Sequence, residues 1–130
     1  AALELIADSY LSVGTPVQVA VPHLLDAGAS IRAAIQERIR HNLATLRRAA
    51  GRYPACELFR TEGGWSAVLR VPATRSEEQL ALDLLRTERI LVHPGYFFDF
   101  SREAYVVMSL LPSPDLFDDA VARLLGFVNS

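Results

Sequence analysis

The fold is decided by residues 90–111, which read ILVHPGYFFDFSREAYVVMSLL. The apolar run 90–93 predicts a short buried strand, and the Pro94-Gly95 pair is expected to end it. The aromatic residues of 96–100 are expected to form a loop that lines a pocket, with at least half of the rings serving as ordinary core. Residues 104–111 are strongly apolar and favour a second strand.

Further strands and helices are predicted on both sides of this stretch. Residues 55–59 and 65–71 read as two strands joined by a turn at 61–64. Apolar spacing and capping residues predict helices over residues 1–12, 16–26, 30–50, 76–87 and 113–125. This order predicts an α+β domain of two layers, in which helices cover a small, mostly antiparallel sheet of about three to four short strands.

Two helix starts carry a specific capping signal. Thr15 precedes Pro16 and is expected to be the N-cap of the second helix, with Gln18 closing a capping box. Ser76 and Gln79 predict a second capping box. Glu77, between them, is explained by the favourable effect of a carboxylate at the positive end of a helix dipole.

Composition excludes several classes of protein. The chain has 130 residues, of which 51% are hydrophobic, and this is enough for one domain with a buried core. The net charge of −2 gives no basic excess for nucleic acid. No apolar run approaches the roughly 18–20 residues of a membrane span, and no signal peptide is visible. We therefore expect neither nucleic acid nor a membrane as a partner.

The basic residues are all arginine, because the sequence contains no lysine. Lysine is the side chain that forms Schiff bases with carbonyl compounds, so this chain alone lacks that chemistry. The single cysteine, Cys56, excludes an internal disulfide and a cysteine-cluster zinc site, which fits a cytoplasmic location. His23, His41 and His93 lie too far apart for a local metal motif. We predict no catalytic, cofactor-binding or metal-binding residue in the chain.

Several segments, taken in order, resemble a known family. They are Gly63-Gly64-Trp65, the helix ending Leu84-Leu85, ILVHPGYFF at 90–98, YVVMS at 105–109 and the helix at 116–125. This series resembles the C-terminal small domain of class I/II pyridoxal-phosphate-dependent aminotransferases of fold type I. Residues 10–18 resemble the stretch where those enzymes leave their large domain.

The resemblance implies a division of labour between this chain and a longer parent protein. In such enzymes pyridoxal phosphate forms a Schiff base with a lysine of the large domain, and this chain has no lysine. We therefore expect a fragment without cofactor and without activity: a connecting helical arm at 1–28, whose first helix starts uncapped, and an aminotransferase-like small domain at 29–130. The implied parent is a homodimer that transfers an amino group from a small-molecule amino donor to a 2-oxo acid.

The resemblance also implies a substrate pocket in the parent, contacted by Gly95, Tyr96, Phe98 and Val107. Many members carry an arginine at the position of Val107, where it holds the substrate carboxylate. Valine cannot donate a hydrogen bond, so that contact is missing here. Arg70 and Arg102 are the candidates to replace it.

Two other functions remain open from the sequence. The chain could be the ligand-sensing, aminotransferase-like domain of a transcription regulator, which a helix-turn-helix segment upstream in the gene would reveal. It could also be an independent α+β binding module with a small-molecule pocket of its own, which predicts a capped and ordered N-terminus.

Overall fold

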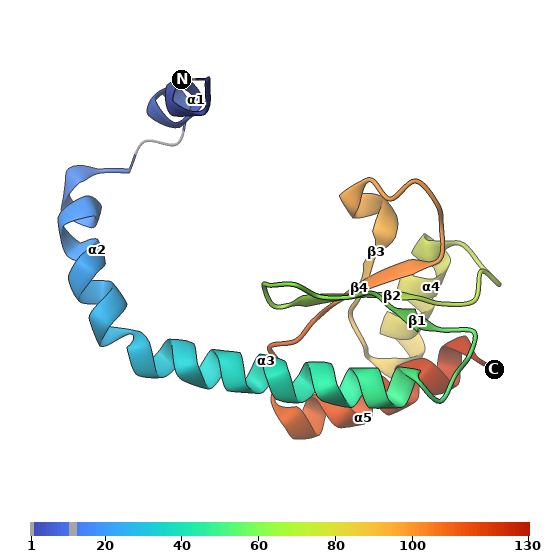
Figure 1. Cartoon of the computed structure of the whole chain (residues 1–130). Coiled ribbons are helices and arrows are strands. Elements are labelled where there is room, and N and C mark those ends of the chain that lie inside the picture. The colour runs from blue at the N-terminus through green and yellow to red at the C-terminus, as the bar shows by residue number, and fades with distance from the viewer. Residues whose placement is uncertain (1, 11–12) are drawn as a thin grey trace. The chain divides into compact units, whose positions relative to one another are not determined.

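The computed structural model describes residues 2–10 and 13–130, and these fall into two compact units, Ala1–Ala34 and Ile35–Ser130. The first unit holds helices α1 (Ala2–Tyr10) and α2 (Thr15–Ala27) and the first residues of α3 (Ala29–Ala50) (Figure 1). Among the residues of this unit whose burial the structure describes, none is buried. The unit therefore presents its apolar side chains on its surface.

The start of α2 differs from the prediction. Gly14, in an extended conformation, is the N-cap, and Thr15 is the first residue of the helix without a capping hydrogen bond from its side chain. Gln18 donates its side-chain amide to the carbonyl oxygen of Val13 at 2.6 Å. The predicted capping role of Thr15 is therefore wrong, because the helix begins one residue earlier than the Thr-Pro signal places it.

The second unit is built on an antiparallel sheet. In the described part of the chain, this sheet has four strands in the order β1 (Glu57–Leu58), β2 (Ser66–Arg70), β4 (Tyr105–Ser109) and β3 (His93–Pro94). The turn between β1 and β2 contains Gly64 at φ +74°, a conformation that glycine adopts without steric cost.

One face of the sheet is covered by helices. Residues 35–50 of α3, the helix α4 (Glu77–Asp83) with its π-helical continuation η1 (Leu84–Glu88), and α5 (Pro114–Val128) all contribute to one hydrophobic core with β2 and β4 (Figure 1). Its fully buried members include Leu46, Leu69, Leu84, Val106, Leu110 and Leu125. The predicted two-layer α+β domain with a small antiparallel sheet is confirmed.

The strand predicted at 90–93 is shorter and lies later than expected. Only His93 and Pro94 pair with β4, although Ile90 and Val92 are buried in the core. Pro94 is the last residue of β3 and Gly95 begins the next element, so the strand ends at the predicted Pro94-Gly95 pair. An edge strand tolerates proline because one side of its backbone needs no hydrogen-bond donor. The predicted aromatic loop begins as a short 3-10 helix, η2 (Gly95–Phe98), which ends at Asp99 with φ 55°.

No helix within the described residues combines the length and the apolar character needed to cross a membrane.

Candidate functional site

One of the predicted pocket residues, Val107, points to the sheet face opposite the core. Val106 and Met108 belong to the core cluster, so Val107, between them on β4, points to the other face. Val107 is 5% exposed and lies between Val68 of β2 and His93 of β3 in the strand register.

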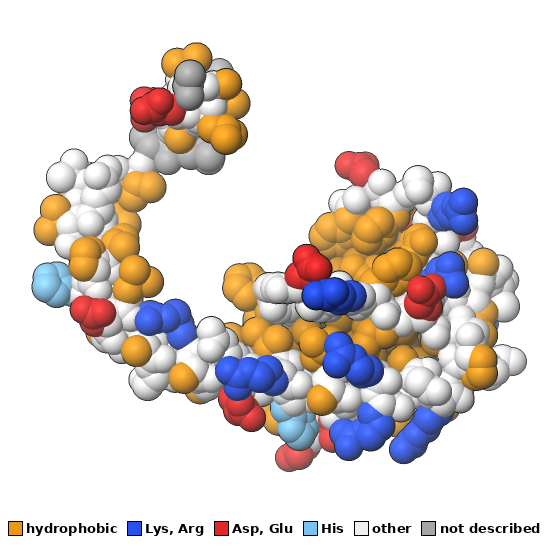
Figure 2. All heavy atoms as spheres, viewed as in Figure 1, with side chains coloured by type: hydrophobic (Ala, Val, Ile, Leu, Met, Phe, Trp, Pro, Cys, Tyr) orange, Lys and Arg blue, Asp and Glu red, His pale blue; other side chains and the backbone are white. Residues whose placement is uncertain are grey.

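Three of the four predicted residues lie on the turn η2. Gly95 is buried, whereas Tyr96 and Phe98 are about half exposed, at 50% and 52%. The ring of His93, which faces Val107 across the β3–β4 pair, lies 6.3 Å from the ring of Phe98. The structure therefore brings Gly95, Tyr96 and Phe98 together and connects them to Val107 through His93. Figure 2 shows hydrophobic side chains gathered over this part of the unit.

An apolar groove of about 340 Å³ runs beside this turn, and we call it the β3–η2 groove. It is bounded by α4, η1, β3 and η2, and its lining includes Leu82, Leu85, Leu91, His93, Tyr96 and Phe97. Sites for small organic molecules are commonly concave and mostly apolar with a few polar groups. The groove has this apolar character, and Glu78 and His93 are the charged or polar residues among those that line it together with Tyr96.

A buried carboxylate holds η2 in place. Glu77, the first residue of α4, is 2% exposed. Its Oε2 accepts the backbone N–H of Tyr96 at 2.9 Å, and its Oε1 accepts the backbone N–H of Tyr105 at 2.7 Å. One side chain therefore connects the start of α4, the turn η2 and the start of β4.

Gly95 is required by this close packing. A Cβ atom at position 95 would lie 2.7 Å from the ring of Phe100, 2.8 Å from Cβ of Tyr105 and 2.9 Å from Oε1 of Glu77. Such contacts are too short for any side chain without movement of the neighbours. The role of Gly95 is therefore to admit the Glu77 carboxylate and the two aromatic residues.

The two arginines considered as replacements for a carboxylate contact are placed differently. Arg70 lies opposite Tyr105 at the end of β2 and forms an ion pair of 2.7 Å with Glu57. Arg102 lines a separate hollow of about 310 Å³ together with Glu77, Tyr96 and Phe100. Of the two, Arg102 is therefore the cation that shares a cavity with a predicted pocket residue.

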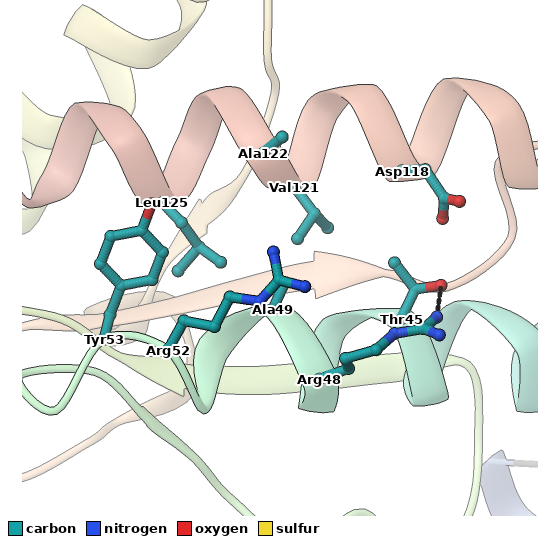
Figure 3. Close-up of a pocket in the computed structure, with 9 residues that line it drawn as sticks. All are labelled: Thr45, Arg48, Ala49, Arg52, Tyr53, Asp118, Val121, Ala122 and Leu125. Atoms are coloured by element: carbon teal, nitrogen blue, oxygen red, sulfur yellow. Dashed lines mark hydrogen bonds between the residues drawn. The ribbon is translucent and has the colours of Figure 1, made fainter.

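A third hollow, of about 280 Å³, lies in the helical layer between α3 and α5. Figure 3 shows the guanidinium group of Arg52, two residues after the end of α3, pointing toward α5, whereas Arg48 of α3 donates to the hydroxyl of Thr45 on the same helix at 3.2 Å. Asp118 of α5 lines the same hollow, so the two cations share it with a carboxylate. It contains none of the predicted pocket residues.

The described residues contain no group of three or more histidine, cysteine or acidic side chains placed to hold a metal ion.

Comparison with known proteins finds similarity in structure but not in sequence. No family model matches the sequence, and no curated protein matches it significantly. Solved structures do match. A pyridoxal-phosphate-dependent aminotransferase from Streptococcus suis superimposes with a TM-score of 0.73 at 17% identity, covering 98% of this chain and 35% of that one. The chain has the fold of part of an aminotransferase.

Two further structures agree with this similarity. An aspartate aminotransferase from Thermotoga maritima gives a TM-score of 0.70 at 19% identity, covering 98% of this chain and 32% of that one. A tyrosine aminotransferase from Leishmania infantum gives 0.65 at 15% identity, covering 95% and 28%. The chain therefore spans about a third of the length of these proteins, and the predicted resemblance is confirmed for the fold.

The residues of this chain do not by themselves fit pyridoxal phosphate. The cofactor requires a lysine amine for its Schiff base, and the sequence has no lysine. This chain alone therefore cannot form that Schiff base through a lysine side chain.

Sequence reasoning missed two residues of this region. Glu77 was explained by the helix dipole alone, and nothing local indicates that its carboxylate is buried against residues 19 and 28 positions later. His93 was considered as a metal ligand, and its position opposite Val107 depends on the register of β3 with β4. The mixed aromatic stretch after Pro94-Gly95 was the available signal for the region, and it located η2.

Proposed function

We propose that the chain is part of a class I/II pyridoxal-phosphate-dependent aminotransferase and forms its C-terminal small domain with the connecting helices. One observation carries the proposal: 98% of the chain superimposes on about a third of the Streptococcus suis aminotransferase. Because the chain lacks lysine, the remainder of the parent protein would bind the cofactor, which supplies the amino-transfer chemistry. The chain alone would be inactive.

In the parent, this chain would form one wall of the substrate pocket. The half-exposed rings of Tyr96 and Phe98 would contact the substrate, while Gly95 and Val107 would shape the backbone and floor beneath them. Val107 brings no charge to the pocket, and its neighbours Val68 and His93 include no guanidinium. The amino donor and the 2-oxo acid would therefore depend on apolar and aromatic contacts from this wall more than on an arginine of β4.

The missing large domain would cover the first unit. The helices of the first unit carry apolar side chains that are each at least half exposed: Leu3, Leu5, Val19, Leu24 and Leu25. Large exposed apolar patches mark interaction surfaces in many proteins. We propose a homodimeric parent in the cytoplasm, a location supported by a single cysteine that can form no internal disulfide.

The test is to express the full product of the gene that encodes this chain, alongside the 130-residue chain alone. The full product is expected to contain a lysine-bearing segment, to show visible absorption from bound pyridoxal phosphate, and to transfer amino groups from at least one member of a panel of amino acids to 2-oxo acids. The chain alone, mixed with pyridoxal phosphate, is expected to show neither property.

Two outcomes would contradict the proposal. A full product with cofactor absorption but a helix-turn-helix segment and no amino transfer would indicate a ligand-sensing regulator. A gene product no longer than this chain would indicate an independent binding module.

A further inference from the structure

The Glu77 carboxylate is an unusual group for the first turn of a short helix because it is buried. Carboxylates at helix starts are ordinarily solvated and act through the dipole. Here the side chain is 2% exposed, and each of its two oxygens accepts a backbone N–H from a different element. A hydrogen bond to an ionised group is roughly twice as strong as one between neutral groups.

The adjacent Glu78 shows how much of the role of Glu77 comes from the helix dipole and how much from its hydrogen bonds. Glu78 occupies the same first turn of α4 and favours the same dipole, but it is exposed and accepts neither of these bonds. Whatever Glu77 contributes beyond Glu78 must therefore come from its contacts with η2 and β4.

Those contacts act on the turn that carries the exposed aromatic rings. The Tyr96 N–H is the group held by Oε2, and the rings of Tyr96 and Phe97 lie 4.9 Å apart and perpendicular. The absence of a side chain at Gly95 makes room for Oε1, because a Cβ atom at position 95 would lie only 2.9 Å from it. The second bond, to Tyr105, fixes the carboxylate to the sheet, so η2 is held relative to β4 as well as to α4.

We propose that Glu77 is a positioning residue for the substrate pocket: its carboxylate fixes the turn η2 so that Tyr96 and Phe98 present their rings in one orientation. The contact of these rings with a substrate rests on the proposed function, whereas the fixing of η2 by Glu77 does not. Because Glu77 acts through the η2 rings, its loss would weaken substrate binding more than it would slow the chemical step.

The first test uses the 130-residue chain itself. Glu77→Gln keeps the size of the side chain but has one carbonyl oxygen and no charge, so it cannot accept both bonds as a carboxylate does. Amide hydrogen exchange at Tyr96 and Tyr105 is expected to become about tenfold faster, since a charge-assisted bond is replaced by a weaker one or none. Glu78→Gln, the matched control, is expected to leave both amides unchanged.

The second test uses the full gene product. Glu77→Gln is expected to raise KM for the amino donor by about tenfold while kcat changes by less than about twofold. A merely structural role would lower the active fraction, which reduces kcat and leaves KM unchanged. Glu77→Asp, which keeps the charge on a shorter side chain, is expected to fall between the wild type and Glu77→Gln.

The outcomes distinguish this inference from the proposed function. Unchanged exchange at Tyr96 and Tyr105 in folded Glu77→Gln overturns the inference, and so does a fall in kcat with unchanged KM. A full product without amino transfer overturns the proposed function and leaves the exchange result to decide on the fixing of η2. If Glu77→Gln does not fold, the wild-type chain decides: its Tyr96 and Tyr105 amides must exchange more slowly than the amide of exposed Arg102, and equal rates overturn the inference.

Discussion

Helices α2 and α5 begin alike and carry the same apolar pattern, yet they have opposite surroundings. Each has a proline in its first turn and an apolar stripe with the spacing i, i+4, i+7 and i+8. In α5 this stripe is Phe117, Val121, Leu124 and Leu125, and all four are buried. In α2 it is Val17, Val21, Leu24 and Leu25, and all four are exposed.

The difference shows that an apolar stripe predicts a covered face without showing what covers it. For α5, the covering surface is the sheet and its neighbouring helices within the same unit. For α2, the described residues of this chain provide no burial, and the proposed large domain of the parent would provide it. The same pattern therefore stabilises the domain in one helix and prepares an association in the other.

The largest expected effect comes from truncating one leucine in each stripe. Leu125→Ala is expected to lower the free energy of unfolding by about 2–5 kcal/mol, because the side chain is 1% exposed and its loss leaves a cavity. Leu24→Ala, with the wild-type side chain 62% exposed, is expected to change it by less than about 0.5 kcal/mol. Urea denaturation of the 130-residue chain measures both, and comparable losses would contradict the contrast between the two helices.

The next effect concerns how α3 is fixed to the sheet. Asn42 is fully buried, and its side-chain amide donates to the carbonyl oxygens of Leu110 at 3.0 Å and Pro112 at 2.9 Å. Asn42→Ala leaves both acceptors without this donor and is expected to cost about 1–3 kcal/mol in the same denaturation experiment.

His41→Ala is the matched control, because His41 is the exposed neighbour on the same helix. It is expected to leave stability within about 0.5 kcal/mol of the wild type. Equal losses in the two variants would contradict the role given to the buried Asn42 amide, because alanine has a higher helix propensity than either residue and cannot lower stability through the helix itself.

The smallest effect compares two helix starts. The Ser76 hydroxyl accepts the backbone N–H of Gln79 at 3.2 Å, so Ser76→Ala is expected to cost about 1 kcal/mol. Thr15 makes no capping bond, and Thr15→Ala is expected to have no measurable effect on stability. Thermal unfolding monitored by circular dichroism measures both, and a loss in Thr15→Ala equal to that in Ser76→Ala would restore Thr15 as a cap.

The sequence predicted what local pattern controls. Among the described residues, the helix positions other than the start of α2, the turn before β2, the Ser76 cap and the α+β class follow from spacing and from single residue types, and the structure agrees. The extent of β3 was not predictable in the same way, because it depends on which residues reach hydrogen-bonding distance of β4. The apolar run 90–93 indicated that Ile90 and Val92 are buried, but it could not show that they pack in the core without pairing with β4.

The aromatic residues of the candidate site were predicted from the sequence, but the buried carboxylate that holds their turn was not. Tyr96 and Phe98 stand out because aromatic residues follow Pro94-Gly95, so the turn was located from composition. The Glu77 contacts join residues far apart in sequence, and a glutamate after a capping serine is common at any helix start. No short-range signal distinguishes a glutamate that is buried from one that is solvated.

Pro94 has a consequence for aggregation. It occupies the outermost strand at one end of the sheet, where a residue without an amide hydrogen cannot pair with a strand from another molecule. At the other end, β1 is two residues long, so a strand from another molecule would find few backbone groups with which to pair. Both edges of the sheet therefore resist the addition of a further strand. Aggregation of the isolated chain would instead proceed through the exposed apolar side chains of its first helices, and mild detergent would reduce it.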